Sequence, residues 1–266
     1  MALKICSIAS GSSGNCIYVG TDNANLLVDS GISKKKVEIG LNAIGVDPYT
    51  IDGILITHEH SDHIKGIGVY ARKYRMPIYA TKKTWNATLN YSSIGKIPEG
   101  LHVEIFPNED FMINDMTIHP FNSFHDAIDP VCYTFKSEDK KISVATDLGC
   151  YDEYIIDNLN GSNVLFIEAN HDIKLLEVGR YPYFLKKRIL SDVGHLSNEA
   201  SGELISTLYN NTLSHVILGH LSLENNFPEL AYESVKTVLA SYSHVDLDKF
   251  NLSVASRSSH SKLVVV

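Results

Sequence analysis

The stretch of sequence that decides the fold is Ile54-Leu55-Ile56-Thr57-His58-Glu59-His60-Ser61-Asp62-His63. Its apolar start predicts a buried strand, and three histidines and a carboxylate follow where that strand ends. His58 and His60 are two positions apart, so in an extended chain their side chains leave the backbone on the same side. We expect the chain to turn into a helix at Asp62 and His63, which directs these side chains toward a second ion.

The residue types of this cluster indicate metal binding. Imidazole and carboxylate groups suit Zn²⁺, Mn²⁺ or Fe²⁺, and the cluster has none of the thiolates that structural zinc sites often use. Packing alone explains it poorly, because histidines crowded at a strand end repel one another when they are protonated. The cluster therefore predicts a site for divalent metal.

The same stretch resembles the first metal motif of the metallo-β-lactamase-fold hydrolases, His-x-His-x-Asp-His, and matches it at every specified position. The resemblance implies an α/β fold, a four-layer αββα sandwich of two mixed sheets flanked by helices, with the ligands on loops at one edge. It also implies two divalent ions per chain, which we expect to be Zn²⁺, Mn²⁺ or Fe²⁺.

Three later residues match the remaining metal motifs of this family: His125, Asp147 and His220. Each follows a strand-like run, and strand ends hold side chains rigidly while loops let them converge. A single loop histidine is more often just hydrogen-bonded, but matches in the expected order favour metal binding. The resemblance implies that Asp147 is shared and that the two ions take, respectively, His58, His60 and His125, and Asp62, His63 and His220.

Two further segments match the family outside the ligand set. Asp29 lies in Leu27-Val28-Asp29-Ser30-Gly31, where a family carboxylate orients the metal loop without binding metal. The loop Gly11-Ser12-Ser13-Gly14-Asn15 contains glycines that allow close approach, so Ser12, Ser13 and Asn15 could cradle a terminal phosphate through backbone N–H groups. A tight hairpin explains this loop equally well.

His195 and Glu168 separate the possible reactions, because the metal site alone does not name one. Superfamily phosphodiesterases, including transfer-RNA 3′-processing nucleases and a cyclic phosphodiesterase, carry a histidine near the position of His195 that contacts phosphate or protonates the leaving oxygen. In the processing nucleases a glutamate placed like Glu168 pairs with it and keeps a proton available for general acid catalysis. The structural alternative for His195 is a residue beside a helix N-cap, and for Glu168 it is a capped strand end.

Nearly the whole chain resembles the bacterial YycJ/WalJ-type subfamily of DNA exonucleases. Similar segments include Gly194 to Asn198 and Gly219 to Ser222, followed by Glu224-Asn225-Asn226. The resemblance implies 5′ to 3′ removal of nucleotides from DNA by a metal-bridged hydroxide that Asp62 orients, with a link to mismatch repair. The alternatives are a small-molecule cyclic phosphodiesterase, a glyoxalase-like thioesterase with the same ligand pattern, and a noncatalytic, metal-stabilised nucleic-acid-binding protein.

Composition sets the remaining limits. The 266 residues and 44% hydrophobic content predict one domain over 1–266 with a substantial core. No apolar run approaches the roughly 20 residues that span a bilayer, and neither a signal peptide nor paired cysteines are evident, so we expect a cytoplasmic protein without membrane contact. The net charge of −8 argues against nonspecific coating of nucleic acid, and basic clusters such as Lys186-Lys187-Arg188 are typical of solvated helix faces.

The hydrophobic pattern alternates between strand and helix signals without a linker. We expect strands at 3–9, 16–20, 25–29, 51–57, 116–121, 131–135, 141–146, 164–167, 215–218, 252–255 and 262–266. We expect helices at 34–44, 64–74, 151–159, 198–209 and 228–241.

Overall fold

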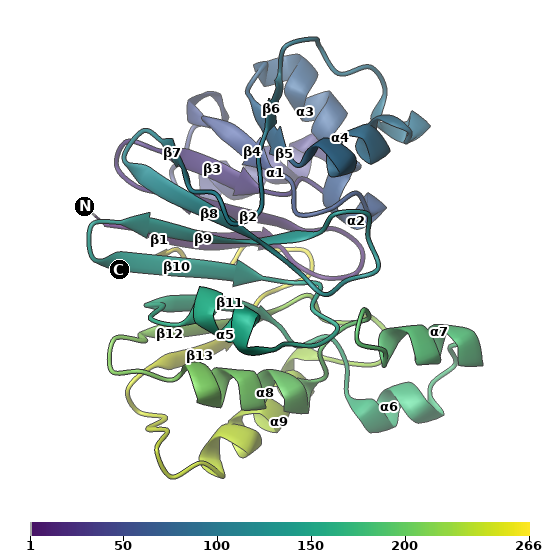
Figure 1. Cartoon of the computed structure of the whole chain (residues 1–266), viewed down its shortest axis with the longest axis vertical. Helices are drawn as coiled ribbons and strands as arrows, with labels where there is room; N and C mark the ends of the chain where they lie inside the picture. The colour runs from purple at the N-terminus through teal and green to yellow at the C-terminus, as the bar shows by residue number, and fades with distance from the viewer. Residues whose placement is uncertain (1) are drawn as a thin grey trace.

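The structure, a computed structural model that describes residues 2–266, contains two seven-stranded sheets packed face to face (Figure 1). Helices α1, α3 and α4 lie on one outer side, and α5, α8 and α9 lie on the other. The predicted four-layer αββα sandwich is confirmed.

The first sheet has the order β14-β1-β2-β3-β4-β5-β6. Its strands are β1 Lys4–Ala9, β2 Cys16–Gly20, β3 Asn25–Val28, β4 Gly53–Leu55, β5 Ile78–Ala80, β6 His102–Glu104 and β14 Val264–Val265. The strands from β14 through β3 pair antiparallel, whereas β3 through β6 are parallel.

The second sheet has the order β13-β12-β11-β10-β9-β8-β7. Its strands are β7 Phe111–Ile113, β8 Met116–Asn122, β9 Val131–Ser137, β10 Lys140–Ala145, β11 Val164–Glu168, β12 His215–Gly219 and β13 Asn251–Val254. The strands β7 through β10 pair antiparallel, whereas β10 through β13 are parallel.

The helices in the described part of the chain are α1 Lys34–Ala43, α2 Ser61–Ile64, α3 Ile67–Tyr74, α4 Lys82–Leu89, α5 Glu153–Leu159, α6 Ile173–Val178, α7 Tyr183–Ile189, α8 Asn198–Leu208 and α9 Pro228–Ala240, with 3₁₀ turns η1 Pro48–Thr50 and η2 Ser92–Ile94. Helices α6 and α7 project beside the sandwich. No helix within residues 2–266 combines the length and apolar character needed to cross a bilayer.

Buried side chains form three layers of core that follow from the period of the strands. Leu26 and Val28 pack between the two sheets, whereas Leu27 faces the outer layer with α1 and α3. Successive side chains of a strand point to opposite faces, so a strand that is apolar throughout must be covered on both sides. The apolar run in β3 is therefore explained by burial on both faces.

The expected helix at 64–74 is wrong in its bounds, since α2 and α3 are separated at Gly66. The Gly66 N–H donates to Ser30 O at 2.8 Å, and a Cβ at Gly66 would lie 2.1 Å from Ile32 O. This close approach of another loop interrupts the helix. The segments β5 to β7, with α4 between, and helices α6 and α7 were not predicted, because they are short and weakly periodic.

Candidate metal centre and active site

The parallel order of both sheets brings the predicted site residues to one edge of the sandwich. Asp29 and the histidine cluster follow the neighbouring strands β3 and β4. Asp147, Glu168 and His220 lie at the ends of β10, β11 and β12, which are also neighbours. Because parallel strands end at the same edge of a sheet, residues far apart in sequence converge there.

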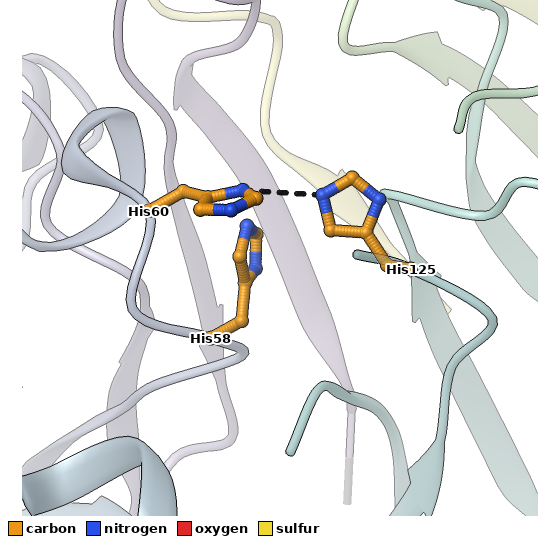
Figure 2. Close-up of side chains that lie close together, drawn as sticks. All are labelled: His58, His60 and His125. Carbon is orange, nitrogen blue, oxygen red and sulfur yellow. Dashed lines mark hydrogen bonds between the residues drawn. The ribbon is translucent and has the colours of Figure 1, made fainter. Parts of the chain in front are cut away.

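The side chains predicted to bind metal lie together in overlapping groups. Within each group the candidate donor atoms lie within 4.8 Å of one another. Figure 2 shows the rings of His58, His60 and His125 pointing toward a common centre. Three other groups overlap with this one across the site: Asp62, His63 and His220; His58, His63 and Asp147; and Asp147, Glu168, His195 and His220. This arrangement brings together the full set that the sequence predicted, with Asp147 between the two histidine groups.

Hydrogen bonds fix the outer nitrogen of several of these rings. His125 Nδ1 lies 3.0 Å from Gly194 O, and His63 Nδ1 lies 2.7 Å from Asp29 Oδ2. The Thr57 hydroxyl donates to Asp29 Oδ2 at 2.8 Å, so it accepts from His58 Nδ1 at 3.0 Å. With Nδ1 protonated, Nε2 keeps its lone pair for a cation.

Two buried atoms support this assignment of the donor atoms. His58 Nε2 and Asp147 Oδ2 are buried and have no hydrogen-bond partner. Leaving a buried acceptor unpaired costs free energy, and a metal ion between these atoms would satisfy both. The residues present therefore fit a divalent ion.

The charge balance of the site points the same way. The carboxylates of Asp29, Asp62, Asp147 and Glu168 pair with histidines, and none pairs with Lys or Arg within residues 2–266. Burial lowers the pKa of His220, but neighbouring carboxylates, Asp147 foremost, outweigh it and raise the pKa to about 10. The site thus favours added positive charge, which a divalent ion supplies.

Three of the converging residues have left-handed backbone conformations. The φ angles are 60° at Asp29, 59° at Asp147 and 55° at His220. Such a conformation is unfavourable outside glycine and persists where surrounding contacts hold it. Asp29 and His220 directly follow β3 and β12, and Asp147 lies two residues after the end of β10, so all three lie where a strand turns into a loop.

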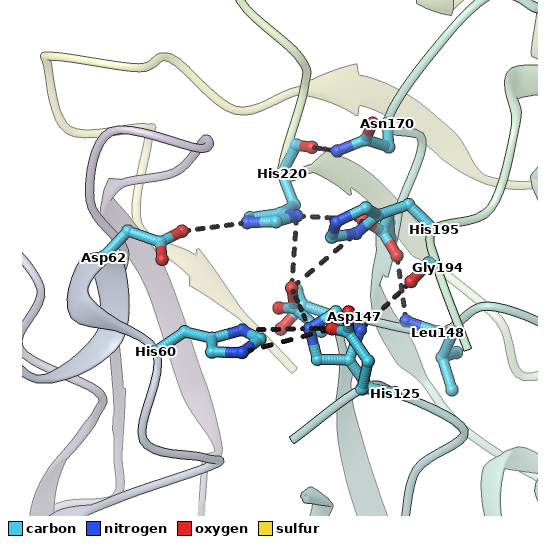
Figure 3. Close-up of polar contacts among 12 residues, drawn as sticks. His60, Asp62, His125, Asp147, Leu148, Asn170, Gly194, His195 and His220 are labelled. Atoms are coloured by element: carbon cyan, nitrogen blue, oxygen red, sulfur yellow. Dashed lines mark hydrogen bonds and ion pairs between the residues drawn. The ribbon is translucent and has the colours of Figure 1, made fainter. Parts of the chain in front are cut away.

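His195 and Glu168 are paired as the sequence predicted. His195 Nδ1 lies 2.7 Å from Glu168 Oε1, and the same oxygen lies 2.9 Å from His220 Nδ1 (Figure 3). The other carboxylate oxygen accepts from Leu148 N–H at 2.9 Å. Buried Glu168 therefore holds His195 and a predicted metal ligand at once, a sharing that the sequence did not reveal.

A cavity of about 320 Å³ opens over this cluster. The His195 side chain is 16% exposed and the Asp62 side chain 22%, so both can reach a substrate in the cavity. Tyr91 and Arg188 also line it, and Arg188 pairs with Asp126, the neighbour of His125. Sequence reasoning did not assign either residue to the site. Arg188 is exposed on helix α7, as expected for the basic run, and it also lines the site cavity.

The three residues predicted to bind phosphate differ in their accessibility. Ser12 lines the cavity and Ser13 is exposed beside it. Asn15 is buried, its N–H donates to Asp62 O at 2.8 Å, and its side-chain oxygen accepts from Gly11 N–H at 2.9 Å. Asn15 is thus not free to cradle phosphate, and instead it holds the Asp62 loop.

Comparison with known proteins agrees with this geometry. Residues 9–180 match the metallo-beta-lactamase superfamily. The chain belongs to this superfamily. It is 42% identical to exodeoxyribonuclease YycJ of Bacillus anthracis over 239 residues, with 90% of each chain covered. It is also 42% identical to exodeoxyribonuclease WalJ of Streptococcus pneumoniae strain D39 over 240 residues, covering 90% of this chain and 89% of the relative.

The superfamily fold is also found in solved structures. The metallo-beta-lactamase fold protein YhfI from Bacillus subtilis superposes with a TM-score of 0.73 at 15% identity, with both chains fully covered. Likeness at this identity shows the shared fold alone. The family resemblance drawn from the histidine cluster is therefore confirmed by sequence and by structure.

Proposed function

We propose that the chain is a metal-dependent exodeoxyribonuclease that removes nucleotides from DNA in the 5′ to 3′ direction. The observation that carries the proposal is the His195–Glu168 pair, which stands in the cavity beside the ligand cluster. A glyoxalase-like thioesterase has no evident use for such a pair. Both relatives that are 42% identical to the chain over the aligned residues are named exodeoxyribonucleases, and these names supply the DNA substrate of the proposal.

The proposal requires divalent ions in the cluster. One ion would be held by His58, His60 and His125 and another by Asp62, His63 and His220, with Asp147 shared. When bound, such ions polarise phosphoryl oxygens and make a water nucleophilic near neutral pH. We expect Zn²⁺ or Mn²⁺, because the donors are imidazole nitrogens and carboxylate oxygens.

The chain's own residues supply orientation and proton transfer. Asp62 faces the cavity, where its carboxylate can orient the attacking water. His195 Nδ1 is committed to Glu168, so Nε2 is the ring nitrogen that can donate to the leaving oxygen. The hydrogen bond to Glu168 holds the ring in place, and the Nε2–H group can also interact with negative charge that develops on the phosphate. Both sheets contribute to this one site, which supports a single domain over 1–266.

The test measures His195→Ala beside the wild type, both reconstituted with Mn²⁺ or Zn²⁺. Substrates are DNA labelled at the 5′ or 3′ end, RNA of the same sequence, and the thioester S-lactoylglutathione. Loss of a general acid lowers turnover about 10²-fold to 10⁴-fold. We expect this loss on DNA with metal content unchanged, since His195 lies outside the proposed ligand set.

The matched control is His244→Ala, which removes a histidine that does not line the cavity. Full activity of His195→Ala on DNA would contradict the assigned role. Hydrolysis of the thioester without any release of nucleotides by the wild type would overturn the proposed function.

A further inference from the structure

A second cavity, of about 470 Å³, adjoins the site cavity. The chain around His220 links the linings of the two cavities: His220 lines the first, and its N–H donates to Ser10 Oγ at 2.8 Å. Ser10 and Leu221, the residue after His220, both line the second cavity. This cavity therefore begins one residue away from the proposed metal centre, yet nothing in the mechanism above uses it.

Arg257 lies where the two cavities meet. Its Nη1 is 3.5 Å from the Oγ atoms of both Ser12 and Ser13, and its Nη2 donates to Leu221 O at 2.6 Å. Ser12 lines the site cavity and Arg257 the second one. Burial lowers the pKa of Arg257, and the group that opposes this effect is the hydroxyl of Tyr181 rather than a carboxylate. A partly buried guanidinium beside two hydroxyls is well suited to a phosphate.

Much of the remaining lining of the second cavity is apolar and exposed. Leu223 is 65% exposed and Phe227 is 49% exposed, and both line it. The polar side chains of the lining are already used: Asn226 donates to two backbone carbonyls, and Ser222 accepts from a backbone N–H at 3.2 Å. An exposed aromatic ring beside an anion site fits a nucleobase, which stacks without hydrogen-bonded readout.

We propose that the second cavity is a nucleotide subsite. Arg257, with Ser12 and Ser13, binds the phosphate next to the scissile one, and Phe227 with Leu223 packs against the neighbouring base. The inference rests on the proposed function, because it requires a polynucleotide substrate. It adds that the base is held by stacking alone, so cleavage is independent of base identity at this position.

The first experiment compares Arg257→Gln with Arg75→Gln, which removes the same charge from an exposed residue of the outer helical layer. Substrates are a single-stranded oligonucleotide and bis(p-nitrophenyl) phosphate, a diester without a neighbouring nucleotide. Loss of a charge-assisted contact lowers affinity about 10-fold to 100-fold. We expect the ratio of kcat/KM for DNA to kcat/KM for the small diester to fall by that factor in Arg257→Gln alone.

A binding measurement separates recognition from turnover. Thymidine 3′,5′-bisphosphate is titrated calorimetrically into metal-loaded protein, and we expect its Kd to rise about 10-fold in Arg257→Gln and to stay unchanged in Arg75→Gln. The base is tested with an oligonucleotide that carries an abasic position beside the scissile bond. The wild type should prefer the intact strand, and Phe227→Ala should lose about 5-fold or more of that preference.

The outcomes distinguish the two proposals. Equal effects of Arg257→Gln and Arg75→Gln in both assays, with the wild type active on DNA, would overturn the subsite and leave the nuclease proposal standing. Wild-type protein that hydrolyses neither DNA nor the small diester would overturn the nuclease proposal and the subsite with it. An unchanged preference against the abasic strand in Phe227→Ala would refute the base contact.

Discussion

Replacement of Glu168 by glutamine is expected to lower both stability and turnover, because this one buried carboxylate accepts three hydrogen bonds. Its Oε1 serves the Nδ1 atoms of His195 and His220 at 2.7 and 2.9 Å, and its Oε2 serves Leu148 N–H at 2.9 Å. Glutamine keeps one oxygen. If that oxygen faces the two imidazoles, the amide NH₂ group faces the Leu148 N–H, and two donors meet. If the oxygen faces Leu148 instead, both imidazoles lose their acceptor.

The orientation with the glutamine oxygen toward the imidazoles disturbs fewer groups, so we use it to estimate the loss of stability. An unpaired buried N–H costs about 1–3 kcal/mol. For a chain of this length, about 2 kcal/mol corresponds to a fall in Tm of roughly 4–8 °C. The substitution also replaces the carboxylate that holds His195 with a neutral amide, which removes a charge-assisted hydrogen bond, and we expect kcat to fall about 10-fold to 100-fold.

The assay uses two readouts on Glu168→Gln. The Tm of metal-free protein measures the effect of the lost hydrogen bond on stability. The kcat on end-labelled DNA measures the effect on the proton donor His195, and saturating Mn²⁺ keeps the metal site filled in this assay. Glu104→Gln is the control, since Glu104 is exposed on the edge strand β6. Wild-type Tm and wild-type kcat in Glu168→Gln would refute the view that this carboxylate organises the site.

Three further predictions concern metal binding, the carboxylate that orients a metal ligand, and the stability of the protein in acid. Asp147→Ala is expected to lose bound metal, measured by mass spectrometry of the ions; two ions retained would refute the shared position. Asp29→Ala removes the carboxylate that accepts hydrogen bonds from Thr57 and His63. We expect metal affinity, measured by competition with a chelator, to fall about 10-fold to 100-fold, and an unchanged affinity would contradict this role of Asp29. Hydrogen bonds from Lys34, Lys73 and Tyr74 lower the pKa of Glu38 from 4.5 to about 2, so its stabilisation is present above pH 4.5 and is lost as the pH falls toward 2. In urea unfolding of metal-free protein, Glu38→Gln should therefore be less stable than the wild type at pH 7, with a gap that narrows at pH 3; a constant gap would show that the ion pairs are not its source.

The sequence could bring forward the proposed metal-binding residues because their signals are local. In the stretch from Ile54 to His63, an apolar strand, a turn and a helix start are all encoded by neighbouring residues. His125, Asp147 and His220 could be placed in the same way, since each follows a strand-like run. The family resemblance then supplied the partition of these residues between two ions, which spacing alone could not give.

Residues whose roles depend on distant partners were predicted less well. Asn15 belongs to a glycine-rich loop typical of phosphate binding, but its amide is occupied by the Asp62 loop, 47 positions away. Arg188 belongs to a basic run on the exposed helix α7, as expected, but its place in the cavity lining and its ion pair with Asp126 were not predicted. Neither partner is marked by any pattern near the residue itself.

The sequence by itself thus determined which side chains end the strands and what chemistry those side chains allow. The tertiary structure decided which of them meet. The parallel register of β11 and β12 sets Glu168 opposite Gly219, and this brings its carboxylate to His220 while His195 arrives from the loop before α8. The physical reason is that strand order and register are fixed by burial of both sheets between helical layers, a property of the whole chain that no local spacing contains.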